Sequence, residues 1–106
     1  MSFSVKSEVI DNTAIIAVEG SLDSSTAPKL HDEVQRIILQ NPKDLVLNVE
    51  KLNFMASAGL RVIIFAKQKL GSAAKLFLVK PQDQVVETLR MTGLLFSVTI
   101  VDQYPE

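Results

Sequence analysis

The chain has 106 residues, of which 47% are hydrophobic and 22% are charged, and this length and apolar content predict one domain spanning residues 1–106. The formal net charge at pH 7 is -1, so the chain offers no basic field that could hold nucleic acid or an anionic membrane. Cysteine is absent, which excludes disulfides, thiol nucleophiles and thiolate metal ligands.

The N-terminal part of the chain predicts a β-hairpin followed by a helix. Apolar and polar residues alternate over residues 3–10, and Asp11-Asn12 then provides a two-residue turn before the apolar run 13–18. Residues 22–26 are rich in side chains that cap helices. Apolar residues then recur three and four apart, which predicts a helix that extends to about Gln40.

The remaining chain alternates strands with helices. Residues 44–49 are mostly apolar on both faces, as buried parallel strands are, and should lie in the middle of the sheet. A second helix is predicted over about residues 57–70, followed by a strand at 75–79, a helix from Pro81 to Gly93, and a last strand at 98–101. Four apolar residues of the second helix should face the core: Leu60, Ile63, Ile64 and Leu70.

This order of elements, β-β-α-β-α-β-α-β, predicts an α/β fold with a mixed β-sheet of about five strands covered by α-helices. The N-terminus contains no basic region followed by a long apolar stretch, which would be the pattern of a secretory signal. No apolar run approaches the roughly 18 residues that are needed to span a bilayer. We therefore expect a cytoplasmic protein that does not insert into membranes.

The residue types of common enzyme sites are not grouped in this sequence. His31 is the only histidine and lies on the polar side of the first helix, so neither a metal site nor a Ser-His-Asp arrangement can be assembled around it. Asp32 and Glu33 are adjacent in a helix, where neighbours point about 100° apart, and they should only add solubility. Gly59 alone is too little for a phosphate-binding loop. We expect no catalytic residue, metal or cofactor.

The segment 53–60 is more informative, because it follows the central strand and leads into a helix, where open α/β sheets place functional groups. Ser57 is predicted at or near the N-cap of that helix. Its hydroxyl could simply accept a hydrogen bond from a first-turn N–H, which contributes about 1 kcal/mol, and position alone favours this structural role. Asp23, before the first helix, is likewise typical of a cap or turn residue.

Three segments, taken with this order of elements, resemble the STAS family, which is named after sulfate transporters and anti-sigma-factor antagonists. They are Gly20-Ser21-Leu22-Asp23, Leu52-Asn53-Phe54-Met55-Ala56-Ser57-Ala58-Gly59-Leu60 and Thr92-Gly93-Leu94. The resemblance covers nearly the whole chain. It implies that Ser57 is phosphorylated by a partner kinase that is also the anti-sigma factor, and that Asp23 lies close to Ser57 on the partner surface.

Two positions depart from the family pattern. The acidic residue that usually precedes the serine is Ala56 here, and the usual second serine is Ala58, so polar contacts that could help a kinase to recognise the segment are missing. Phe54 and Met55 should divide between the core and the partner surface, because consecutive residues near a strand end point to opposite faces. The resemblance assigns six residues to partner binding: Asp23, Phe54, Met55, Ala56, Ala58 and Gly59.

The resemblance therefore implies an anti-sigma factor antagonist, a monomeric binding switch and not an enzyme. When Ser57 is unphosphorylated, it would bind a cognate anti-sigma factor serine kinase and so regulate transcription indirectly, and a serine phosphatase is a second expected partner. The alternatives are an accessory subunit of an ABC-type membrane transporter, a small enzyme with Ser57 as nucleophile, and a self-associating scaffold subunit. The apolar residues Leu94-Leu95-Phe96 are predicted to pack in the core and its neighbouring loop, and the alternative is an exposed apolar contact.

Overall fold

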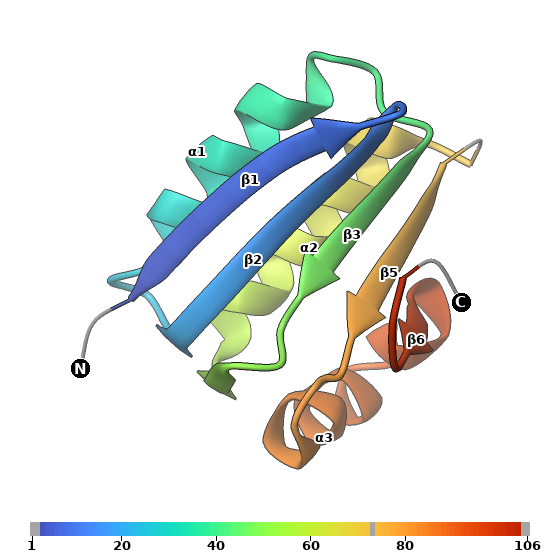
Figure 1. Ribbon diagram of the computed structural model, residues 1–106. Coiled ribbons are helices and arrows are strands. Elements are labelled where there is room, and N and C mark those ends of the chain that lie inside the picture. Colours follow the sequence, from blue (N-terminus) through green and yellow to red (C-terminus); the bar gives the residue numbers. More distant parts are fainter. Residues whose placement is uncertain (1–2, 73, 105–106) are drawn as a thin grey trace.

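A computed structural model describes residues 3–72 and 74–104 of the chain (Figure 1). Six strands, three α-helices and one 3-10 turn follow one another in these residues: β1 (Ser4–Ile10), β2 (Thr13–Leu22), α1 (Ala27–Ile38), β3 (Asp44–Asn48), β4 (Leu52–Met55), α2 (Ser57–Leu70), β5 (Lys75–Val79), α3 (Asp83–Met91), η1 (Leu94–Ser97) and β6 (Thr99–Val101). The predicted α/β fold with a mixed sheet is confirmed.

The sheet has the strand order β1-β2-β3-β5-β6, so the strand predicted to be central, β3, is in the middle. β1 pairs antiparallel with β2, and the remaining neighbours are parallel. Pairing of Ile10 with Thr13 leaves only Asp11 and Asn12 in the turn between β1 and β2. Both have positive φ, 50° and 67°, as the tight turn of a twisted hairpin requires, and the predicted turn is confirmed.

The strand β2 is longer than predicted and has two partners on the same side. Its first half, from Thr13 to Ala17, pairs with β3, and its second half pairs with β4, where the sequence predicted no strand. A four-residue segment with an asparagine carries a weak strand signal of its own. It becomes a strand because β3 ends at Asn48 and leaves the last residues of β2 without a neighbour.

The helices cover one face of the sheet. α1 and α2 lie side by side behind it in Figure 1, and α3 packs against β4 near the carboxyl ends of the parallel strands. The main core lies between this face and the helices; its largest fully buried side chains include Ile16, Leu30, Leu45, Ile63, Leu78 and Leu89. Four residues of α2 were predicted to face inward, and this prediction is wrong for Ile64, whose side chain is 39% exposed. The face of α2 towards the sheet is occupied by Val62, Ile63 and Ala66.

The opposite face of the sheet carries no helix within the described ranges. A small second cluster lies on it, formed by Val46, Phe77, Val79 and Val101. The ring of Tyr104 packs on Phe77, with 4.9 Å between ring centroids, and its hydroxyl donates a hydrogen bond to Asp44 Oδ2 at 2.9 Å. The last described residues therefore lie against this face. Over residues 3–72 and 74–104, no helix is long and apolar enough to cross a membrane.

Candidate functional site

The site expected from the sequence lies at the start of α2. Ser57 is the first residue of this helix, and Ala56 is its N-cap, with extended backbone (φ -94°, ψ 177°). Ser57 is exposed, and no side chain caps this helix terminus. Within the described part of the chain, the Ser57 hydroxyl makes no hydrogen bond. The Ser57 side chain therefore does not cap the helix, although its position alone favoured that role. Its hydroxyl is accessible from solvent.

Pairing between β2 and β4 places Asp23 beside this helix terminus. Leu22 pairs with Met55, and the Ala56 N–H donates to the Leu22 carbonyl at 2.9 Å. Asp23 follows Leu22 directly, so it lies next to the residue that precedes Ser57. Two of the three segments that carry the family resemblance, one around Asp23 and one around Ser57, are thus neighbours in space although they are more than thirty residues apart.

The side chain of Asp23 organises the turn that leads into α1. Its Oδ1 accepts hydrogen bonds from the Ser25 hydroxyl at 2.7 Å and from the N–H groups of Ser25 and Thr26 at 2.9 and 3.2 Å. The hydrogen bond from the Ser25 hydroxyl is the main reason why the pKa of Asp23 lies below its usual value. The predicted role of Asp23 as a turn residue is confirmed, and the carboxylate is held ionised beside the Ser57 terminus.

Phe54 and Met55 divide between surface and core as predicted. The Met55 side chain is 2% exposed and belongs to the main core, whereas Phe54 is 43% exposed. The Met55 side chain is buried between α2 and the strands, and its assignment to partner binding stays a prediction. Phe54 stays accessible, and Ala56 and Ala58 are half-buried on either side of Ser57.

Gly59 is likewise buried, and its assignment to partner binding also stays a prediction. A Cβ added at this position would lie 2.6 Å from Leu22 Cδ2 and 2.9 Å from Met55 Cγ. Glycine is needed here so that the first turn of α2 can approach the strands closely. Its contribution to the site is to set this approach.

Two residues of α3 contact the site, and the sequence pattern did not point to either. The Gln84 side-chain amide bonds the Met55 backbone twice: its Oε1 accepts from the N–H at 2.8 Å, and its Nε2 donates to the carbonyl at 3.3 Å. The Thr88 hydroxyl accepts from Gln84 Nε2 at 3.0 Å. Spacing of four residues on a helix predicts that Gln84 and Thr88 share a face, but nothing in the sequence says which backbone they meet.

The third segment of the resemblance ends α3. Gly93 has φ 79°, and Thr92 Oγ1 donates to the carbonyl of Thr88 at 3.0 Å. Leu94 and Leu95 are half-buried against the main core, as predicted. The same prediction was wrong for Phe96, which is 94% exposed because the 3-10 turn directs it to solvent.

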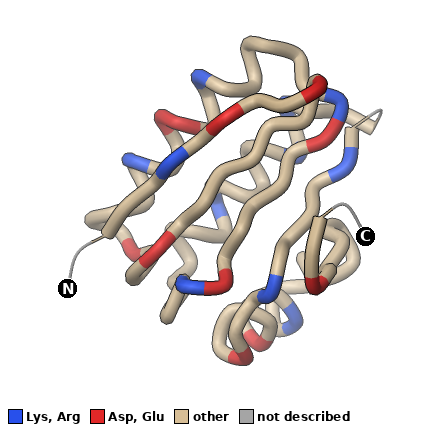
Figure 2. Tube along the Cα trace, in the orientation of Figure 1, with Lys and Arg blue, Asp and Glu red and all other residues tan. Residues whose placement is uncertain are grey.

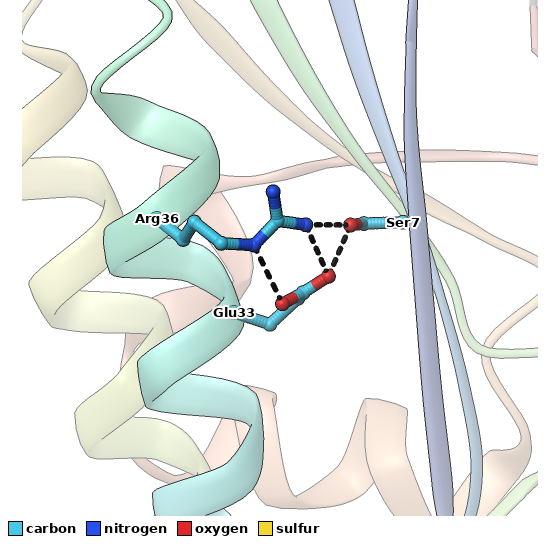
Figure 3. Close-up of polar contacts among 3 residues, drawn as sticks. All are labelled: Ser7, Glu33 and Arg36. Atoms are coloured by element: carbon cyan, nitrogen blue, oxygen red, sulfur yellow. Dashed lines mark hydrogen bonds and ion pairs between the residues drawn. The ribbon is translucent and has the colours of Figure 1, made fainter.

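The other polar residues considered from the sequence make packing contacts and hydrogen bonds within the fold. The His31 ring lies against Phe65, with 4.3 Å between centroids. Glu33 does more than add solubility: it accepts from Arg36 Nη2 at 2.7 Å and from the Ser7 hydroxyl, and so joins α1 to β1 (Figure 3). No group of three or more His, Asp or Glu in the described ranges could hold a metal ion. Basic and acidic residues are interspersed along the trace (Figure 2).

Comparison with known proteins finds one matching family and relatives with similar names. The model of the family described as "STAS domain" matches residues 4–106. The anti-sigma-F factor antagonist RsfB of Mycobacterium tuberculosis is 24% identical over 84 residues, which are 79% of this chain and 69% of RsfB.

Solved structures of two proteins extend the comparison to the fold. An anti-sigma factor antagonist from Mycobacterium paratuberculosis superimposes with a TM-score of 0.84 at 22% identity, over 97% of this chain and 88% of that one. The Bacillus anti-sigma factor antagonist SpoIIAA superimposes in its unphosphorylated form with a TM-score of 0.77, at 21% identity over 94% and 88% of the two chains. In its phosphorylated form the TM-score is 0.70, at 20% identity over 94% and 91%.

Proposed function

Because the chain belongs to the STAS family, we propose that it is an anti-sigma factor antagonist that binds an anti-sigma factor while Ser57 is unphosphorylated. The observation that carries this proposal is the state of Ser57: it is exposed at the first position of α2, its hydroxyl makes no hydrogen bond in the described part of the chain, and Asp23 lies beside it. The names of the relatives favour this function over that of a transporter accessory subunit.

The modification is a phosphoryl transfer from the kinase partner's ATP to the Ser57 hydroxyl, which loses its proton. A phosphoserine carries about -1.5 to -2 charge, and negative charge at a helix N-terminus is favoured by the helix dipole. Phosphorylation of Ser57 should therefore leave α2 and the fold intact. Phosphorylation should instead weaken partner binding. At the interface the phosphate adds bulk, must be desolvated, and adds to the negative charge of Asp23.

The surface around Ser57 also defines the kind of contact that a kinase partner must make. Phe54 is 43% exposed, and Ala56 and Ala58 flank Ser57, so the immediate surroundings of the hydroxyl are apolar. Family members with an acidic residue and a second serine offer polar contacts there. We propose that the partner of this chain recognises the serine by shape and apolar contact, with the Asp23 carboxylate at the edge of this surface.

The test compares four baits in a pull-down from the native host: wild type, Ser57→Ala, Ser57→Asp and Ser72→Asp. Ser72 is exposed beyond the other end of α2, so Ser72→Asp adds the same charge away from the site. Wild type, Ser57→Ala and Ser72→Asp should capture one kinase-like protein that Ser57→Asp does not. Mass spectrometry of the wild-type bait should find phosphate on Ser57 and none at that position in Ser57→Ala.

The melting temperature separates binding from folding. Ser57→Asp should melt within a few degrees of wild type. Equal capture by Ser57→Asp and Ser72→Asp would contradict the proposal, and so would capture of a permease-associated ATPase in place of a kinase, which would support the transporter alternative.

A further inference from the structure

We infer that Gln84 of α3 is a positioning residue for Ser57, acting through the Met55 backbone. This inference rests on the proposed function in so far as it concerns phosphorylation. It begins with the edge of β4. The Ala56 N–H points to β2, where it meets the Leu22 carbonyl, and successive backbone groups of a strand alternate in direction. The N–H and C=O of Met55 therefore point away from β2.

No strand lies on that side of β4 in the described residues, and Gln84 takes the place of one. Its amide accepts from the Met55 N–H at 2.8 Å and donates to the Met55 carbonyl at 3.3 Å, which are the two bonds that a neighbouring strand would supply. The Met55 N–H can only donate, so it must face the amide oxygen, and this fixes the orientation of the Gln84 amide. Thr88 Oγ1 supports this arrangement: it accepts from Gln84 Nε2 at 3.0 Å and lies 3.4 Å from the Met55 carbonyl, to which it can donate.

Besides the packing of Gly59 on Leu22 and Met55, side-chain polar contacts at the start of α2 are few, and the Gln84 contact is one of them. Ala56 has no polar side chain, no side chain caps the helix, and the Ser57 hydroxyl makes no hydrogen bond in the described part of the chain. Met55 lies two residues before Ser57 and is anchored on one side by its buried side chain. Gln84 anchors the backbone of Met55, and with the Ala56–Leu22 bond it sets the position from which the first turn of α2, and the Ser57 hydroxyl, project.

The experiment places a reporter at Ser57. The chain has no cysteine, so Ser57→Cys creates a protein with a single thiol. A helix N-terminus lowers the pKa of a thiol from its ordinary value of about 8.5, whereas the neighbouring Asp23 carboxylate raises it. Asp23 is unchanged in every variant below, so a difference in thiol pKa between variants reports the order of the first turn of α2. The rate of alkylation by iodoacetamide, measured between pH 6 and pH 10, gives this pKa without any partner protein.

Three variants are made in the Ser57→Cys background. Gln84→Met keeps the side-chain length and removes both hydrogen bonds, and should raise the thiol pKa by about 0.5 unit, or slow alkylation about threefold at neutral pH. Thr88→Val keeps the shape and should give a smaller rise. Gln82→Met is the matched control, because Gln82 bonds the Glu50 carbonyl at 2.8 Å and not Met55, and its pH profile should equal that of the parent.

Thermal unfolding verifies that each variant is folded. If Gln84→Met does not fold, the test rests on Thr88→Val. Identical pH profiles for the parent and the folded variants would overturn the inference, as would an equal shift in Gln82→Met. Because the titration needs no kinase, a shift confined to the Gln84 and Thr88 variants supports the inference even where the pull-down contradicts phosphorylation of Ser57.

Discussion

At the scale of single residues, Gly59 decides how closely α2 approaches β2 and β4. Gly59→Ala would normally stabilise a helix by up to about 1 kcal/mol. Here the added Cβ would meet Leu22 Cδ2 at 2.6 Å, and the buried side chains around it have little room to move. Overpacking costs about 1–3 kcal/mol, so Gly59→Ala should lower the free energy of unfolding by about 1 kcal/mol, measured by urea denaturation.

A double-mutant cycle with Leu22→Ala identifies the cause of this loss. Removing the contacted side chain should make Gly59→Ala less costly than it is in the wild type, because the Cβ then has space on that side. If Gly59→Ala lowers the unfolding free energy equally in wild type and in Leu22→Ala, the loss comes from the backbone and not from the contact with Leu22.

The residues of the site differ in how far the sequence could predict them. Ser57 and Asp23 lie in segments with recognisable local patterns, and both are where the sequence placed them to within one position. Burial of Met55 and exposure of Phe54 follow from alternation along a strand, but which of the two points inward depends on the pairing of β4. Gln84 could not be predicted, because its contact depends on where α3 packs.

At the scale of elements, α1 is joined to β1 by three polar side chains. Arg36 and the Ser7 hydroxyl both hydrogen-bond the Glu33 carboxylate, and the Arg36 bond is the main reason why the pKa of Glu33 lies below its ordinary value of 4.5. A carboxylate with a lowered folded-state pKa stabilises the fold above pH 4.5, and this contribution is lost as pH falls through the folded-state pKa.

Glu33→Gln should therefore lower stability at pH 7 and have progressively less effect as pH falls below 4.5. Urea denaturation of wild type and variant at pH 7, 5, 4 and 3 measures this difference. Asp32→Asn is the control, since Asp32 is 83% exposed and makes no contact with β1 among the described contacts. A gap between wild type and Glu33→Gln that stays constant down to pH 3 would contradict the expected role of the carboxylate.

The elements themselves divide into those set by local pattern and those set by the rest of the fold. The boundaries of α2 and β5 follow from apolar spacing and from Gly71, and they agree with the structure. Local pattern does not predict β4 or the last part of β2. These two segments form strands by pairing with each other. Local propensity carries no information about such a pair.

At the scale of the whole molecule, the sheet has helices on one face and the Tyr104 ring on the other. Tyr104→Phe removes the hydrogen bond to Asp44 and should cost about 1 kcal/mol of unfolding free energy. Tyr104→Ala also removes the packing on Phe77 and should cost more. Urea denaturation compares the two, and equal losses would mean that the ring contributes nothing beyond its hydroxyl.

The length of β2 separates two ends of the molecule. This strand begins beside the Asp11-Asn12 turn and ends at Leu22, next to the Ser57 terminus, so its ten residues span about 30 Å. Lys43 is exposed at the turn end, where its N–H donates to the Asn12 carbonyl at 2.8 Å. In a chain without cysteine, Lys43→Cys therefore offers an attachment point for a fluorophore or a surface tether that leaves the opposite end, with Ser57, open to whatever approaches it.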